Sequence, residues 1–271
     1  MGTELARHLL EDHELTVWNR SAERAHPLLE AGAQGASTPQ EAVKGAEIVI
    51  TSLFGPDDIR EVVLSTGLIP AGVSWIDTTT VAPEDAREFA AAVEGYIHCP
   101  VVGSLGPARA GELGVYVGTP DADRRAQALH IVSPWAGENK LIGVDSAAKA
   151  ATGKLLANLA LAVTAQGVSE ALNLGESAGI EAAEVLDMLD ITGLAFMKNM
   201  KASFILGERE TSPGDFTVDA LCKDAELMAR TAQHPLPAVN AAIDSLKKQQ
   251  AAGHGDEDFS SIFVYRNDAS D

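Results

Sequence analysis

The sequence is poor in aromatic residues and in positive charge. Aromatics make up only 5 % of its 271 residues, whereas Ala is abundant. A composition rich in Ala and poor in aromatics favours packed helices over an all-β sandwich. Lys and Arg number 20 against 39 Asp and Glu, which gives a formal net charge of −19. This charge argues against nucleic-acid partners and anionic membranes, because both attract positively charged protein surfaces.

Cysteine and long apolar runs are also scarce. The two cysteines, Cys99 and Cys222, lie far apart, without a CxxC pair or a His cluster at metal-ligand spacing. We therefore expect no metal site, two buried reduced thiols and a cytoplasmic location. No uninterrupted apolar run reaches the roughly 18 residues of a membrane span, and residues 1–10 lack the apolar core of a signal peptide. We therefore expect no membrane partner.

The first half alternates between strand and helix patterns. Residues 46–53 (AEIVITSL) are almost wholly apolar, as in a parallel strand that helices cover on both faces. Further strands are expected at 15–18, 73–76, 95–98, 113–117 and 140–142. Helices are expected at 2–11, 21–32, from 38 onward, 58–65, 83–93 and 120–131. This alternation predicts an α/β domain with a Rossmann-like, doubly wound parallel sheet.

The second half shows helix patterns throughout. Residues 147–178 favour one long interdomain helix. Further helices are expected at 181–191, 194–204, 217–232 and 236–252. We therefore predict a cofactor-binding domain over residues 1–145 and an all-α substrate and dimerisation domain over residues 146–271.

The chain starts on a helix, whereas a doubly wound domain normally opens with a strand and a Gly-rich turn. Gly2 directly precedes this helix, where the end of a G-x-G-x-x-G turn belongs. We therefore expect the first strand of the sheet to be missing. The next strand ends in Asn19-Arg20-Ser21. An Arg there accommodates the 2′-phosphate of NADP, whereas an acidic residue selects NAD. A solvated loop arginine is the alternative.

Five segments together resemble the β-hydroxyacid dehydrogenase family over essentially the whole chain. The family includes 3-hydroxyisobutyrate dehydrogenase and glyoxylate/succinic semialdehyde reductase, and its cofactor domain resembles that of 6-phosphogluconate dehydrogenase. The segments are Val17-Trp-Asn-Arg-Ser21, Asp77-Thr-Thr-Thr-Val-Ala-Pro83, Cys99-Pro-Val-Val-Gly-Ser104, Lys154-Leu-Leu-Ala-Asn158 and Phe216 with Lys223-Asp224. The resemblance implies an NADP-dependent oxidoreductase that acts on a small carbonyl or hydroxy-acid substrate.

The resemblance also implies roles for individual residues. The residues that would bind NADP are Gly2, Asn19, Arg20, Ser21, Leu53, Thr80 and Lys223. The residues that would bind the substrate are Val102, Gly103, Ser104 and Phe216. Val102 stands where the family has a serine that holds a substrate carboxylate, so carboxylate recognition is open. Ser104 is the candidate replacement.

The catalytic residues that the resemblance implies are Lys154 and Asn158. Residues at i and i+4 share one helical face. A lysine ammonium beside the developing alkoxide can stabilise it and supply a proton. We align Lys154 because only this lysine is followed four residues later by Asn; Lys149 is the second candidate.

Two other functions stay open. One is an imine reductase, which shares the architecture but usually carries Asp or Tyr at the position of Lys154. The other is a cofactor-free scaffold, because the missing strand and glycines would remove backbone N–H groups from the pyrophosphate site. The resemblance and the long apolar helix also predict a homodimer or homotetramer.

Overall fold

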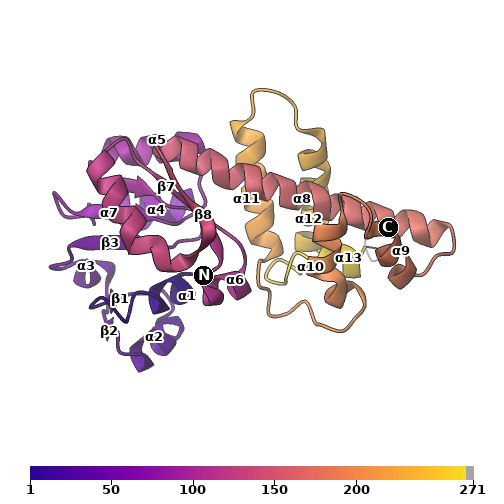
Figure 1. The fold of residues 1–271 in the computed structure, drawn as a ribbon, viewed down its shortest axis with the longest axis horizontal. Helices are drawn as coiled ribbons and strands as arrows, with labels where there is room; N and C mark the ends of the chain where they lie inside the picture. Colours follow the sequence, from indigo (N-terminus) through magenta and orange to yellow (C-terminus); the bar gives the residue numbers. More distant parts are fainter. Residues whose placement is uncertain (267–271) are drawn as a thin grey trace. The chain divides into compact units, whose positions relative to one another are not determined.

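The computed structural model describes residues 1–266 and divides the chain into two compact units (Figure 1). Unit 1 runs from Met1 to Lys154, and unit 2 begins at Leu155. The sequence places the domain boundary just before the long helix α8 (Ala147–Ser177), whereas the structural division falls within its first turns. Helix α8 therefore belongs to both units, and each unit is described by itself below.

A six-stranded sheet forms the centre of unit 1. Its strands are β3 (Ile48–Thr51), β4 (Ser74–Asp77), β5 (Tyr96–His98), β6 (Val101–Val102), β7 (Leu113–Gly118) and β8 (Ala136–Val144). Strands β3, β4 and β5 are parallel, which confirms the predicted α/β sheet. Strand β7 is antiparallel to β5 and β6, and β8 pairs with β7 in parallel. The sheet is therefore mixed rather than wholly parallel. The sequence did not predict β6, because two residues are too few to show a strand pattern.

Two further strands of unit 1, β1 (Thr16–Val17) and β2 (Gln34–Gly35), pair in parallel as a separate sheet. Among residues 1–266, no strand joins β1 to β3. The two strands β1 and β2 are therefore separate from the six-stranded sheet.

The helices of unit 1 surround both sheets. They are α1 (Gly2–Arg7), the 3₁₀ turn η1 (Ala22–Ala25), α2 (His26–Glu30), α3 (Pro39–Ala42), α4 (Pro56–Ile59), η2 (Arg60–Leu64, with π geometry), α5 (Pro83–Ala92), α6 (Leu105–Ala110), α7 (Ala122–Val132) and the 3₁₀ turn η3 (Ser133–Trp135). Helix α1 ends four residues before the predicted end at residue 11. The predicted helix 21–32 is instead the turn η1 followed by α2.

The starts of two helices of unit 1 differ. Ser21 precedes η1 but makes no side-chain capping bond. The Thr38 hydroxyl, at the start of α3, accepts a hydrogen bond from the Glu41 backbone N–H at 3.1 Å and so caps the helix. The Glu41 carboxylate accepts from the Ser37 N–H at 2.7 Å, one residue before the capping residue.

Large aromatic side chains fill the core of unit 1. Trp75, Phe89 and Trp135 are fully buried. The Trp135 indole N–H donates to the Leu5 carbonyl oxygen at 3.0 Å, which ties α1 to the turn η3.

Both cysteines are buried and free, as predicted, and burial raises the pKa of the Cys222 thiol to about 11.

Unit 2 is built of helices, as predicted. They are the part of α8 from Leu155 onward, α9 (Ala182–Leu189), α10 (Ala195–Ile205), α11 (Val218–Thr231), α12 (Pro237–Ala251) and α13 (Ser261–Val264). The small residues Ala162 and Ala165 let neighbouring helices approach α8 closely in a shared apolar core. Among the described helices, α8 alone is long and apolar enough to cross a membrane. Because helices that form a protein core pass the same test, we draw no membrane assignment from it.

Candidate functional site

The loops that follow β3 and β4 are joined by hydrogen bonds at the carboxyl end of the sheet. The Thr78 N–H and hydroxyl both donate to the Thr51 carbonyl oxygen, at 2.8 and 2.9 Å. The Leu53 N–H donates to the Thr79 hydroxyl at 3.0 Å. These bonds hold together the loops that contain the predicted cofactor residues Leu53 and Thr80. Ligands of open α/β sheets bind at this end of the strands.

A buried polar network lies beneath these loops. The Asp77 carboxylate accepts hydrogen bonds from the Thr51 hydroxyl at 2.8 Å, the Thr79 N–H at 3.1 Å and the Tyr96 hydroxyl at 3.1 Å. Burial, together with the nearby Asp77 charge, raises the pKa of Tyr96 well above its ordinary value, so the Tyr96 hydroxyl stays protonated and donates a hydrogen bond to Asp77. His98 Nδ1, 3.1 Å from the Tyr96 oxygen, must then be the protonated nitrogen that donates to it. Asp77 was predicted only as part of its motif, and its role in this network was missed.

The segment after β1 carries the residues predicted to meet the adenosine ribose. The Ser21 N–H donates to Asn19 Oδ1 at 3.0 Å, so the Asn19 side chain shapes the turn. The Arg20 side chain is 82 % exposed, and its Nη1 lies 3.6 Å from Asp58 Oδ1. Its guanidinium is therefore accessible to a phosphate.

Gly2 lies close to the loop after β3. A Cβ atom at Gly2 would lie 3.0 Å from the Ser52 Cβ, which is tighter than nine in ten Cβ contacts, so a side chain there would require Ser52 to shift. The exposed guanidinium of Arg20 and the joined loops that hold Leu53 and Thr80 therefore fit the adenosine and nicotinamide parts of a dinucleotide.

The predicted substrate segment is Val102-Gly103-Ser104, at the end of β6. Gly103 has a φ of 138°, and a Cβ there would lie 2.6 Å from Leu113 Cδ2. Glycine is therefore required at this position. Ser104 precedes α6 without a side-chain capping bond. Val102 is half-buried and has no polar side-chain group.

Lys154 is buried in helix α8, with a relative exposure of 8 %. Lysine is almost never buried unless a partner or a function keeps it there. The preceding residue, Gly153, packs directly on an aromatic ring, since a Cβ there would lie 2.7 Å from Tyr116 Cζ. The start of α8 is thus held in place immediately before Lys154.

Asn158, one turn later and within unit 2, is 4 % exposed. Its Nδ2 donates to Asp224 Oδ2 at 2.6 Å. Lys223 Nζ lies 2.7 Å from Asp224 Oδ1, so one buried carboxylate holds both side chains. Sequence reasoning missed this anchoring role of Asp224, although the residue belongs to the Lys-Asp pair. The other predicted residue of unit 2, Phe216, packs edge-to-face on Phe259, with 6.0 Å between the ring centroids.

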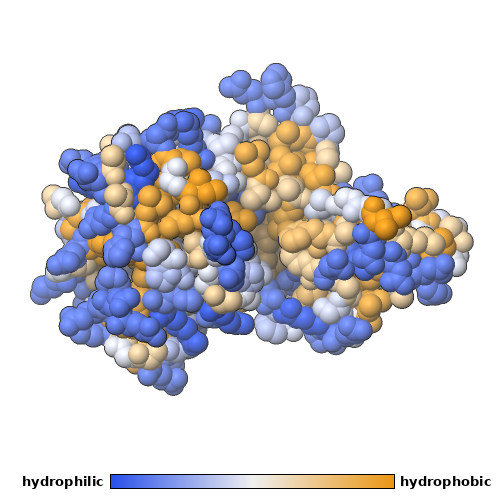
Figure 2. Space-filling model, in the orientation of Figure 1, coloured by the Kyte–Doolittle hydropathy of each residue, from blue (hydrophilic) through white to orange (hydrophobic). Residues whose placement is uncertain are grey.

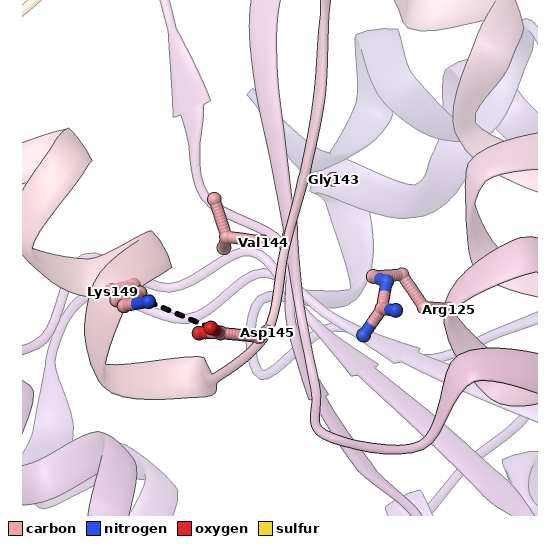
Figure 3. Close-up of a pocket in the computed structure, with 5 residues that line it drawn as sticks. All are labelled: Arg125, Gly143, Val144, Asp145 and Lys149. Carbon is pink, nitrogen blue, oxygen red and sulfur yellow. Dashed lines mark hydrogen bonds and ion pairs between the residues drawn. The ribbon is translucent and has the colours of Figure 1, made fainter.

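The second candidate lysine has a different environment. Lys149 is 63 % exposed at its side chain and pairs with Asp145 at 2.7 Å (Figure 3). Arg125 lines the same open depression, and its Nη1 donates to the Thr119 carbonyl oxygen at 2.6 Å. An exposed ion pair contributes little and leaves the lysine strongly solvated. Burial therefore distinguishes Lys154 from Lys149.

The described residues offer no metal site, since among residues 1–266 no three His, Cys, Asp or Glu side chains cluster suitably.

Family models match both halves of the chain. The model for the NAD binding domain of 6-phosphogluconate dehydrogenase matches residues 1–143, and that for the NAD-binding domain of NADP-dependent 3-hydroxyisobutyrate dehydrogenase matches residues 148–265. The 3-hydroxyisobutyrate dehydrogenase of Pseudomonas aeruginosa is 32 % identical, over 97 % of this chain and 94 % of the relative. The chain belongs to the β-hydroxyacid dehydrogenase family. It is therefore a nicotinamide-dependent oxidoreductase, as predicted.

Solved structures show the same fold. A Mycobacterium tuberculosis 3-hydroxyisobutyrate dehydrogenase with L-serine has a TM-score of 0.80 at 25 % identity, over 98 % of this chain and 96 % of that chain. An imine reductase from a Pseudomonas species has a TM-score of 0.62 at 23 % identity, over 98 % and 96 %. At that identity the second likeness shows the fold alone.

Proposed function

We propose that this oxidoreductase transfers a hydride between NADP(H) and a small carbonyl or hydroxy-acid substrate, with Lys154 as general acid and base. The observation that carries the proposal is the burial of Lys154 and Asn158 at the positions of the family's K-x-x-x-N motif. Positions i and i+4 share one face of helix α8, and a lysine ammonium on that face can transfer a proton to a reacting oxygen.

The nicotinamide, when bound, supplies or accepts the hydride, while the protein supplies orientation and the proton. In the reductive direction, the Lys154 ammonium stabilises the alkoxide that develops on the substrate oxygen and gives it a proton. Asp224 fixes the Asn158 amide through Nδ2. The Asn158 carbonyl oxygen then serves as an acceptor that orients either the ammonium group or a substrate hydroxyl.

NADP is the cofactor that the residues favour. Arg20 presents an exposed guanidinium after β1, with Asn19 and Ser21 beside it in the same turn. A planar guanidinium suits the 2′-phosphate that distinguishes NADP from NAD. The family model that matches residues 148–265 is also that of an NADP-dependent enzyme. Lys223 is proposed to contact the cofactor as well.

Two lysine variants on one helix test the catalytic assignment. We expect Lys154→Ala to lower kcat by at least about 100-fold, the low end of general acid–base contributions, while the dissociation constant of NADPH changes little. Lys149→Ala, the matched control, should retain near-normal turnover. Normal turnover in Lys154→Ala, together with loss in Lys149→Ala, would transfer the role to Lys149.

An imine reductase is the second candidate function. Val102 favours it, because no side-chain hydroxyl is present there to bind a substrate carboxylate. Lys154 argues against an imine reductase, since these enzymes usually carry Asp or Tyr at this position. A panel of small aldehyde acids and cyclic imines, assayed with NADPH, separates the two functions. Turnover of imines alone would favour the second.

We also propose a cytoplasmic homodimer or homotetramer. Large apolar side chains are exposed on the helices of unit 2 and on the turn between α9 and α10, and Figure 2 shows apolar surface on this unit. They include Leu156, Leu174, Met188, Ile191 and Phe196. Burial of such surface against a second copy is favourable. Light scattering during size-exclusion chromatography tests the assembly, and a monomer at micromolar concentration would contradict it.

A further inference from the structure

Asp58 faces the guanidinium of Arg20 within unit 1. It lies in the short helix α4, after β3, whereas Arg20 follows β1. Asp58 Oδ2 accepts a hydrogen bond from the Gly55 N–H at 3.2 Å, which fixes the carboxylate at the start of the helix. Its other oxygen, Oδ1, lies 3.6 Å from Arg20 Nη1. The carboxylate, 25 % exposed, is thus held in place, whereas the arginine is 82 % exposed.

The Asp58 carboxylate weakens the electrostatic attraction that Arg20 can exert on the 2′-phosphate of a dinucleotide. A 2′-phosphate beside Arg20 would meet the negative charge of Asp58 as well as the positive charge of the guanidinium. Like charges at such distances repel, and the repulsion offsets part of the attraction that selects the phosphate. A ribose with a free 2′-hydroxyl is neutral, and a carboxylate readily accepts a hydrogen bond from it.

We propose that Asp58 is a specificity-determining residue that weakens the preference of Arg20 for a 2′-phosphate and lets the protein also bind NADH. The inference rests on the proposed role of Arg20 in NADP binding. It assigns to this chain a cofactor preference that is smaller than an unopposed arginine would give.

The size of the effect follows from the exposure of the pair. If one guanidinium contacts both a carboxylate and a phosphate with about two negative charges, in a medium close to water, the two anions would repel each other enough to weaken binding about fivefold. Salt screens such interactions, since the Debye length falls from about 10 Å at 0.1 M to about 3 Å at 1 M. The effect should therefore shrink as the salt concentration rises.

The substitution Asp58→Asn tests this role. It removes the charge, keeps the shape and keeps an oxygen that can accept from the Gly55 N–H. Titration of nicotinamide fluorescence at low salt should show NADPH binding about fivefold tighter than in the wild type, with NADH unchanged or weaker. Asp58→Ser, which also retains an oxygen acceptor, should show the same direction. At 1 M salt the variant and the wild type should bind NADPH with nearly equal affinity.

Asp57→Asn is the matched control. It removes the same charge one residue away, from a carboxylate that is 96 % exposed and pairs with Arg60 at 2.9 Å. We expect less than a twofold change for either cofactor. Any of three results would overturn the inference. Asp57→Asn could tighten NADPH binding as much as Asp58→Asn does, Asp58→Asn could change NADPH and NADH binding equally, or salt could leave the effect of Asp58→Asn unreduced.

Arg20→Ala separates this inference from the proposed function. If Arg20→Ala leaves the preference for NADPH over NADH unchanged, the proposed role of Arg20 fails, and the role of Asp58 fails with it. If Arg20→Ala lowers that preference but Asp58→Asn does not raise it, only the role of Asp58 is refuted.

Discussion

The ion pair between Lys201 and Asp258 in unit 2 supports a prediction about stability. Lys201, in α10, is 5 % exposed, and Asp258 is fully buried. The Lys201 ammonium lies 2.6 Å from Asp258 Oδ1 and 4.0 Å from the centroid of the Phe259 ring. The N–H and hydroxyl of Ser260 also donate to Asp258. The pair joins α10 to the segment that precedes α13.

Lys201→Met should strongly destabilise unit 2. Methionine has a similar length but no charge, so Asp258 would be left buried without its cation. Removal of one partner from a buried ion pair typically costs about 3–5 kcal/mol, and the remaining Ser260 donors put our expectation near the lower end, about 3 kcal/mol at pH 7. The exposed Lys248→Met in α12 is the control, with an expected change below about 0.5 kcal/mol.

The assay can follow each unit separately. The three tryptophans, Trp18, Trp75 and Trp135, all lie in unit 1, so their fluorescence reports on that unit during urea unfolding. Circular dichroism at 222 nm follows the helices of both units, so a transition that appears in circular dichroism but not in fluorescence belongs to unit 2. In Lys201→Met the loss should appear in circular dichroism at lower urea, while the fluorescence transition moves less.

The pH dependence gives a second check with a defined sign. Burial alone would raise the pKa of Asp258, but the Lys201 charge and the Ser260 donors outweigh it and hold this pKa below its ordinary value. In the wild type this group stabilises the fold above about pH 3.9, the unfolded value, and the contribution is lost as pH falls through the folded pKa. Without Lys201, burial dominates and the Asp258 pKa rises above the unfolded value.

The penalty in Lys201→Met should therefore shrink as pH falls from 7 toward 4, because the buried carboxyl becomes neutral. Burial also lowers the pKa of Lys201 itself, a group that only the wild type carries. A penalty below 0.5 kcal/mol at pH 7, or one that stays constant down to pH 4, would refute the reasoning.

Two further predictions concern unit 1. Asp77→Asn should lower the free energy of unfolding of this unit by about 2–3 kcal/mol, because the carboxylate accepts three buried hydrogen bonds and an amide NH₂ would oppose one of the donors. Urea unfolding followed by tryptophan fluorescence measures this loss, and a value under about 0.5 kcal/mol would contradict the prediction. Arg20→Ala should weaken NADPH binding about tenfold or more and NADH binding less than twofold, as measured by fluorescence titration, and equal losses would contradict the assignment.

The sequence predicted those elements whose apolar pattern is strong. The run of β-branched residues at 46–53 formed β3 (Ile48–Thr51), and the residues expected to form the long helix formed α8. Strand β6 and helix α6 were missed because two and six residues give no reliable period. Pairing partners decide the antiparallel direction of β7, and no local pattern encodes them.

The candidate site was predictable only in part, for the same reason. Motif positions suggested Lys154, Asn158 and Arg20 as candidates, but did not show which residues hold Asn158 and Arg20 in place. Asp224, which binds Asn158 across 66 positions, and Asp58, which faces Arg20, come from segments distant in the sequence. Their roles depend on tertiary packing, whereas motifs record residue type and local spacing.

The most direct test of the account is a comparison of NADPH and NADH binding to the wild-type chain by fluorescence titration. The account predicts saturable, one-to-one binding of NADPH at micromolar concentration, with NADH bound more weakly. An absence of NADPH binding up to millimolar concentration would contradict the account and would favour a cofactor-free scaffold.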